Sequence, residues 1–142
     1  MERRLLENGR PLVAEIVVDA SAILALLQAE PGGDRVAAIL ADPAQSVLIS
    51  TLNWSETLDK LLRRGTSLSD AERQIARLGM EVVNFDVEQA RIAASLRIRA
   101  PFLSLGDRAC IAVATVRFAA AWTAERSWKS FQSDVMIELI RP

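Results

Sequence analysis

The chain has 142 residues, a length that suits one compact domain, and 51% of them are hydrophobic, which is enough to fill a core. Its 17 basic and 18 acidic residues give a formal net charge of -1, so contact with a nucleic acid has to be local rather than a broad basic coating. The chain has no histidine and a single cysteine, Cys110, which excludes Ser-His-Asp and Cys-His catalysis, histidine-ligated zinc and an internal disulfide.

Targeting signals are not evident in the sequence. No apolar run approaches the roughly 18 residues that span a bilayer. Arg3 and Arg4 stand near the N-terminus, but no apolar stretch follows them as it would in a secretory signal. We therefore expect a cytoplasmic protein.

The first 15 residues are interpreted as an N-terminal extension, because Asn8, Gly9 and Pro11 interrupt regular structure. A single domain is expected over residues 16–142. Residues 1–12 are further hypothesised to be a mis-called leader, since Val13 would be a natural start if a GTG codon encoded it. A native intact mass that includes Met1 would contradict this hypothesis.

Short apolar runs predict the strands of the domain, at residues 16–18, 47–49, 81–85, 120–123 and 135–140. Helical patterns lie between them, at residues 20–29, 34–41, 54–64, 70–78, 87–99 and 107–117. Strands that alternate with helices and read as near-continuous apolar runs are typical of a parallel sheet covered on both faces. The fold class is therefore α/β.

Four acidic residues fall where a ligand of such a sheet is expected, beyond the carboxyl ends of the strands. Asp19 directly follows the first strand, and Glu56 opens the helix after the second. Asp107 begins the helix before the fourth strand, and Glu125 follows that strand. Four acids that converge on one edge repel one another, so such a cluster needs a cation or a protonated member.

Each acid also has a purely structural interpretation. Asp19 is a possible helix cap, and the spacing of Asn53 and Glu56 fits a capping box. Asp107 lies in a first helical turn, where the helix dipole favours an acid, and Glu125 follows a possible cap at Thr123. For each acid taken alone, the structural interpretation is stronger than metal binding, but the four acids together favour a metal site.

The ligand types predict the metal and its chemistry. Carboxylate oxygens without nitrogen or sulfur favour a hard ion, so Mg²⁺ is expected, with Mn²⁺ as a possible substitute. Such an ion can activate water and polarise a phosphoryl oxygen, which is the chemistry of phosphodiester hydrolysis. Ser21, two residues after Asp19, either joins this site through its hydroxyl or caps the helix.

Four segments together resemble the PIN-domain nucleases, and most closely the VapC-type toxins of bacterial toxin–antitoxin pairs. They are residues 16–22 (IVVDASA), 53–56 (NWSE), 105–110 (LGDRAC) and 123–128 (TAERSW). The resemblance covers residues 16–141. It implies a three-layer α/β/α fold around a mainly parallel five-stranded sheet, and a Mg²⁺-dependent endoribonuclease that is the toxin of a toxin–antitoxin pair. It also implies a cognate antitoxin and a homodimer.

The resemblance carries over to site residues one by one. Asp19 and Asp107 match the principal metal ligands, Glu56 matches the second acid, and Ser21 matches the hydroxyl beside the first acid. Glu125 departs from the pattern, because the fourth position is usually Asp. The longer side chain keeps the charge but moves it by about one methylene, so the role of Glu125 is left open.

Two other functions stay open on the sequence alone. One is a catalytically weak binding protein that acts mainly in an antitoxin and repressor complex, which the departure at Glu125 favours. Growth arrest by the chain alone, and its increase when Asp is restored at position 125, discriminate this function from a toxin. The other is a phosphatase or phosphotransfer domain, which the serine at position 21 disfavours because the common signature has an acid there.

Overall fold

A five-stranded sheet organises the computed structural model, which describes residues 14–142. Its strands are β1 (Ala14–Val18), β2 (Gln45–Ser50), β3 (Glu81–Val83), β4 (Ala120–Thr123) and β5 (Ile137–Leu139). The strand order is β3-β2-β1-β4-β5, and every neighbouring pair is parallel. The predicted α/β class and the parallel five-stranded sheet are therefore confirmed. The predicted extension falls largely on residues 1–13, outside the described residues.

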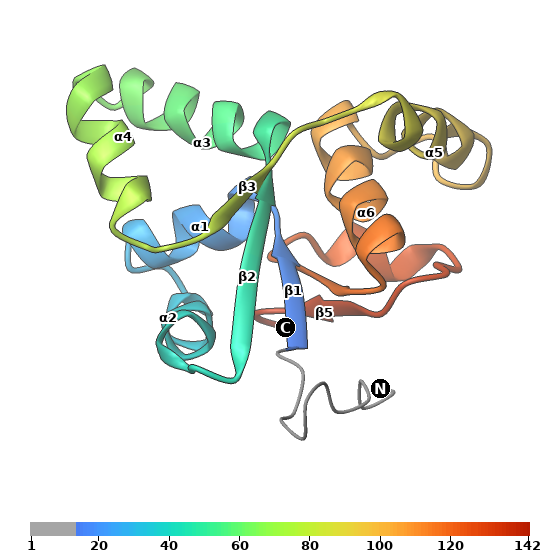
Figure 1. Cartoon of the computed structure of the whole chain (residues 1–142), viewed down its shortest axis with the longest axis horizontal. Coiled ribbons are helices and arrows are strands. Elements are labelled where there is room, and N and C mark those ends of the chain that lie inside the picture. Colours follow the sequence, from blue (N-terminus) through green and yellow to red (C-terminus); the bar gives the residue numbers. More distant parts are fainter. Residues whose placement is uncertain (1–13) are drawn as a thin grey trace, which may run out of the picture.

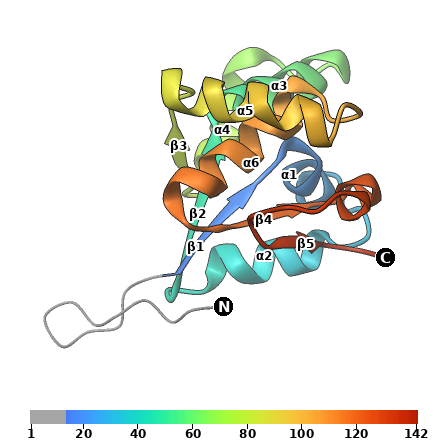
Figure 2. The ribbon, with the colours of Figure 1, turned by 90° about the vertical axis from the view of Figure 1, so that its right-hand side faces the viewer.

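Helices cover both faces of the sheet, as Figures 1 and 2 show. On one face lie α1 (Ala20–Leu27) and α2 (Gly33–Ala41), and on the other lie α5 (Val87–Arg99) and α6 (Leu105–Arg117). The helix α3 (Thr51–Arg63) leaves the carboxyl end of β2 at the top of Figure 1 and leads to α4 (Leu68–Ala76). No helix of residues 14–142 is both long and apolar enough to cross a membrane.

The alternation of side chains along β1 explains why both faces are covered. Ile16 and Val18 point to the face of α1 and α2, where they pack in one apolar cluster with Ile23. Val17 points the other way and packs in a second cluster with Ile111 of α6. Because Ile16, Val17 and Val18 are all apolar and buried, this end of the strand has no face that is suited to water.

Several element boundaries differ from the predicted ones because local capping decides them. The strand β1 begins at Ala14, two residues before the predicted start. Ser50 caps α3 through a bond from Leu52 N, so the predicted cap at Asn53 is wrong. Ser67 caps α4, which begins at Leu68, two residues before the predicted start. A short 3-10 helix, η1 (Arg126–Ser130), was not predicted, since it has no apolar periodicity of its own.

The turn between α1 and α2 receives the C-terminal segment of the chain. Gly32 has a φ of +91°, and a Cβ added there would lie 2.6 Å from the carbonyl oxygen of Ile140. Arg141 forms an ion pair with Glu30 at 3.2 Å beside this contact. The absence of a side chain at Gly32 thus allows β5 and the residues after it to lie against the turn.

Ala29→Gly is expected to stabilise the protein by about 1 kcal/mol, because Ala29 has a φ of +53°, a conformation that costs an L-residue roughly 1–2 kcal/mol. Ala38→Gly is the matched control, since Ala38 is exposed inside α2 and glycine there should cost about 0.5–1 kcal/mol. Urea unfolding measures both changes. A loss of stability in Ala29→Gly as large as that in the control would contradict the expectation.

Candidate active site

Asp19 lies at the centre of the sheet edge, where β1 ends and α1 begins. Its side chain caps α1 by accepting a bond from Ala22 N at 2.9 Å on Oδ1, so the predicted capping role is present. The same Oδ1 accepts a bond from Ser21 Oγ at 2.8 Å, and Oδ2 accepts one from Thr123 Oγ1 at 2.6 Å. A carboxylate offers about four lone-pair sites, so one position on Oδ2 stays open to a further ligand.

Two hydroxyl groups tie Asp19 to the chain that follows β4. Ser21 is not a cap, since Asp19 is; its Oγ accepts a bond from Ala124 N at 2.9 Å. Thr123 is fully buried, and its Oγ1 also accepts a bond from Glu125 N at 3.0 Å. From the sequence, Thr123 was expected only to be a possible helix cap. Its place as the last residue of a strand next to β1 was the signal that could have identified it as a site residue.

Glu56 and Asp107 come to the same edge from two different helices. Glu56 lies in the second turn of α3, and Asp107 lies in the first turn of α6. Asp107 forms a capping box with Ser104: its Oδ2 accepts a bond from Ser104 N at 3.0 Å. The predicted helix-terminus role is therefore also present, and it holds the Asp107 carboxylate at the start of α6.

The electrostatics show which of the acids converge. Burial raises the pKa of Asp19 from 3.8 to about 6, and the charge of Asp107 adds to the rise. Burial also raises the pKa of Glu56, again with a contribution from Asp107. Burial raises the pKa of Cys110 well above its usual value, and the charges of Asp19, Asp107 and Glu56 add to that rise. These three acids therefore lie close enough for their charges to act on the same buried part of the sheet edge.

Glu125 stands apart from this group. It is exposed, it precedes η1, and its charge contributes to none of these pKa changes. Among residues 14–142 no three acidic side chains are arranged so as to enclose an ion. The structure thus gathers Asp19, Glu56 and Asp107 into one acidic cluster, and leaves Glu125 at its rim.

The basic and aromatic residues near the site take structural positions. Arg108 donates to the carbonyl oxygen of Ala93 on α5 at 3.0 Å, and within the described chain it forms no ion pair with the acidic cluster. Trp128 is fully buried with a relative exposure of 0%, so it cannot stack on a base. Trp54 and Trp122 are half-buried and pack against the cluster of Ile16 and Ile23.

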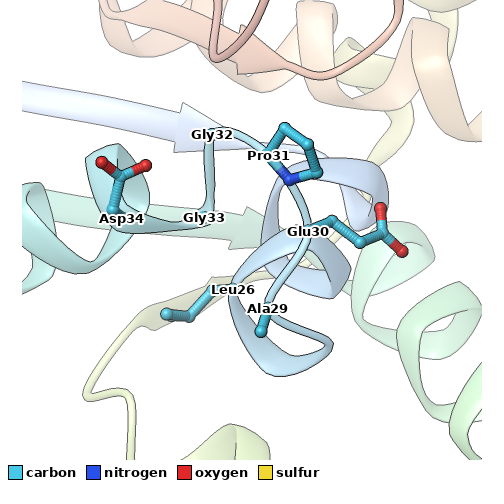
Figure 3. Close-up of a pocket in the computed structure, with 7 residues that line it drawn as sticks. All are labelled: Leu26, Ala29, Glu30, Pro31, Gly32, Gly33 and Asp34. Atoms are coloured by element: carbon cyan, nitrogen blue, oxygen red, sulfur yellow. The ribbon is translucent and has the colours of Figure 1, made fainter.

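Two surface hollows of the described chain lie away from the acidic cluster. Figure 3 shows one of them at the α1–α2 turn, around Pro31, Gly32 and Gly33. Another lies at the α3–α4 turn, around Ser67 and Arg73. The candidate site is therefore the acidic cluster at the sheet edge, in which Asp19 is buried and Glu56 and Asp107 are partly exposed.

The pKa of Asp19 predicts a pH dependence of stability without metal. The folded protein binds the Asp19 proton more tightly than the unfolded chain does, so stability falls as the pH rises from about 4 through about 6. The loss due to this one group is on the order of 3 kcal/mol. Urea unfolding in EDTA at several pH values measures it, and Asp19→Asn should show a smaller loss. Equal losses in the two proteins would contradict the prediction.

Comparison with protein families identifies the fold. The sequence model of the PIN domain matches residues 16–131, which include the whole acidic cluster. The chain belongs to the PIN-domain family. None of the curated proteins compared with this PIN domain matches it.

Solved structures share the PIN fold at low sequence identity. A chain of VapBC2 from Rickettsia felis, bound to a promoter DNA fragment, superposes with a TM-score of 0.68 at 12% identity, covering 87% of this PIN domain chain and 97% of its own. VapC20 from Mycobacterium tuberculosis, described as a toxin that cleaves the sarcin–ricin loop, gives 0.66 at 21% identity, with 81% and 93% covered. VapBC-1 from Haemophilus influenzae gives 0.68 at 14%, with 89% and 98% covered.

Proposed function

We propose that this PIN domain is a Mg²⁺-dependent endoribonuclease and the toxin of a toxin–antitoxin pair. One observation carries the proposal: acids that follow β1 and lie in α3 and α6 come together at the carboxyl edge of the sheet, where burial, with a contribution from the charge of Asp107, raises the pKa of the other two. Within residues 14–142 none of the three forms an ion pair with an arginine or a lysine. Their negative charge is therefore available to a metal ion.

The residues present fit a hard divalent ion in their chemistry. All the donors are oxygens, Asp19 keeps an open position on Oδ2, and Oδ1 of Asp107 makes no hydrogen bond within the described chain. Asp19, Asp107 and Glu56 would hold the ion, and Glu125 would approach it from the rim. When bound, the ion would make water a stronger nucleophile and offset charge on the phosphate oxygens.

The protein groups have separate tasks in this proposal. Ser21 and Thr123 fix the orientation of Asp19 by donating to its two carboxylate oxygens. The capping box with Ser104 fixes Asp107. Hydrolysis forms a bond from the water oxygen to phosphorus and breaks the bond from phosphorus to the leaving oxygen, which takes up a proton. Prior fixing of the acids means that little reorganisation accompanies this step.

Substrate and partners follow from the related structures. VapC20 is described as a toxin that cleaves the sarcin–ricin loop, and VapBC-5 from Mycobacterium tuberculosis is described as a member of a family of toxin–antitoxin systems. We therefore propose RNA as the substrate, a cognate antitoxin as the partner, a homodimer as the assembly and the cytoplasm as the location. The modest formal charge of -1 agrees with local contacts to RNA rather than a broad basic surface.

Removal of the metal is expected to stop RNA cleavage. The purified chain should cut a mixed RNA substrate in Mg²⁺ or Mn²⁺ and become inactive in excess EDTA, because the acidic cluster alone repels the phosphate backbone. Activity should return when Mg²⁺ is added back beyond the EDTA concentration. Gel analysis of end-labelled RNA measures cleavage.

Asp107→Asn, purified in the same way, is the control for a contaminating ribonuclease. Cleavage of equal rate by this variant would assign the activity to a contaminant. Cleavage by the unmodified chain that persists in EDTA would contradict the metal-dependent function.

A further inference from the structure

The helices α3 and α6 contact each other beside the acidic cluster, and the contact is unusually close at one point. Gly106 lies in the first turn of α6, and a Cβ added there would overlap Oε1 of Glu56 and lie 2.7 Å from its Cδ. The Glu56 side chain therefore occupies the space that any other residue at position 106 would fill. The absence of a side chain at Gly106 thus lets the Glu56 carboxylate rest against the start of α6, next to Asp107.

Asn53 joins the two helices at the same point. It lies three residues before Glu56, so both side chains lie on one face of α3. Asn53 is buried, with a relative exposure of 1%, and its Nδ2 donates to the carbonyl oxygen of Gly106 at 3.1 Å. This is a direct bond from α3 to the residue that precedes Asp107.

The second polar atom of Asn53 suggests a role other than stability. Its Oδ1 is buried and has no hydrogen-bond partner in the described chain. A buried polar atom without a partner costs free energy, so an apolar side chain of similar size would be the better choice for packing alone. The amide is therefore poorly explained as core filling and well explained by the bond it gives to Gly106.

We propose that Asn53 is a positioning residue, which with Gly106 holds α3 against α6 and so keeps Glu56 beside Asp107, from where the acidic cluster can close around a divalent ion. The inference rests on the proposed function, and it deepens that function by naming the residues that set the metal affinity. Asn53 touches neither substrate nor metal in this proposal. It acts through the relative position of α3 and α6.

Asn53→Leu tests the bond, because leucine is similar in size and cannot donate. Mn²⁺ alone is the probe, and calorimetric titration of the full chain gives its affinity. We expect Mn²⁺ binding about 10- to 100-fold weaker than in the unmodified chain, as is typical when a residue that orients metal ligands is lost. RNA cleavage should lose kcat by a similar factor while KM is unchanged.

Thr57→Val is the matched control, one turn further along α3. Thr57 is also fully buried, but its hydroxyl donates at 2.7 Å to the carbonyl oxygen of Asn53, within the same helix. The loss of this bond should lower the midpoint of thermal unfolding by a few degrees and leave Mn²⁺ affinity unchanged. A purely structural role of Asn53 would give the same pattern in Asn53→Leu.

Gly106→Ala provides a second test that does not depend on Asn53. The added methyl group should displace the Glu56 carboxylate and weaken Mn²⁺ binding. In a Glu56→Asp background the acid is one methylene shorter, so the same methyl group should cost much less, and the two changes should be non-additive. If Gly106→Ala weakens Mn²⁺ binding by the same factor in both backgrounds, the steric part of the proposal is overturned.

The outcomes separate the inference from the proposed function. If the unmodified chain binds Mn²⁺ and Asn53→Leu binds it equally well, the inference is wrong and the nuclease function stands. If the unmodified chain binds no divalent ion, the proposed function fails and the inference fails with it. Weaker binding in Asn53→Leu with unchanged binding in Thr57→Val supports both.

Discussion

Asp19→Asn is expected to abolish RNA cleavage while leaving the fold intact. Asparagine is as good a helix cap as aspartate, so the bond from Ala22 N is kept and α1 still begins at Ala20. The change removes the negative charge of Asp19 at the sheet edge, where the end of β1 meets the acids of α3 and α6. A metal ion supplies several kcal/mol to such a reaction, and about 1.4 kcal/mol is a factor of ten, so kcat should fall roughly a hundredfold or more.

Stability distinguishes this loss from unfolding. Burial raises the pKa of Asp19 to about 6, so at pH 7 without metal the charged side chain destabilises the fold. Asp19→Asn should therefore be at least as stable as the unmodified chain in EDTA, although it is inactive in Mg²⁺. Asp42→Asn is the control, since Asp42 is exposed, accepts a bond from Ala44 N and precedes β2 at the opposite edge of the sheet.

The paired measurements are the rate of RNA cleavage in Mg²⁺ and the midpoint of urea unfolding in EDTA. Asp42→Asn should match the unmodified chain in both. Cleavage at an undiminished rate by Asp19→Asn would remove Asp19 from the site, and a large loss of stability would show that its main role is structural.

Trp128→Ala is expected to destabilise the protein by about 3–5 kcal/mol, the usual cost of removing a large buried aromatic side chain. Trp128 is fully buried and packs in one cluster with Ile111, Val113 and Ile137, so the change leaves a cavity between η1, α6 and the sheet. Thermal and urea unfolding measure the loss. This is a large fraction of the roughly 5–15 kcal/mol that typically stabilises a domain.

Trp128→Phe is the conservative partner of this change. The Nε1 atom of Trp128 is buried without a hydrogen-bond partner in the described chain, so phenylalanine gives up volume but no polar bond. It should retain most of the stability. Loss of RNA binding in Trp128→Phe without loss of stability would instead indicate that the indole contacts a base, contrary to its burial.

The sequence predicts the sheet and the three central acids for the same physical reason. The β-branched run that ends at Val18 is followed directly by Asp19. This one pattern predicts the strand, the place where it ends and the acid at that end. Parallel strands end at one edge, so Asp19 and the residues after β2 and β4 were predicted to lie close together. The structure brings Asp19, Glu56 and Asp107 together, and it leaves Glu125 exposed at the rim.

The features that the sequence does not predict are those that need a partner from another element. Gly106 could be any glycine near a helix start until the position of α3 is known. Asn53 has the spacing of a cap to Glu56, and only the nearness of α6 shows that it bonds to Gly106 instead. Trp128 follows a polar stretch, and its burial depends on how η1 packs against α6.

On the proposed function, the bonds around Asp19 also bear on when during synthesis the chain would become active. Thr123 and Asp19 are 104 positions apart, and Ser21 and Ala124 are 103 apart, so the bond to Oδ2 of Asp19 and the anchoring of Ser21 form only after β4 has paired with β1. Contacts between residues so distant in the chain form late during synthesis from the N-terminus. A ribosome that has not yet released the β4 segment therefore carries a nascent chain in which Asp19 has only its local bonds to Ser21 and Ala22. On the proposed function, nuclease activity would wait for nearly complete translation, which would give a partner made alongside the chain time to be present first.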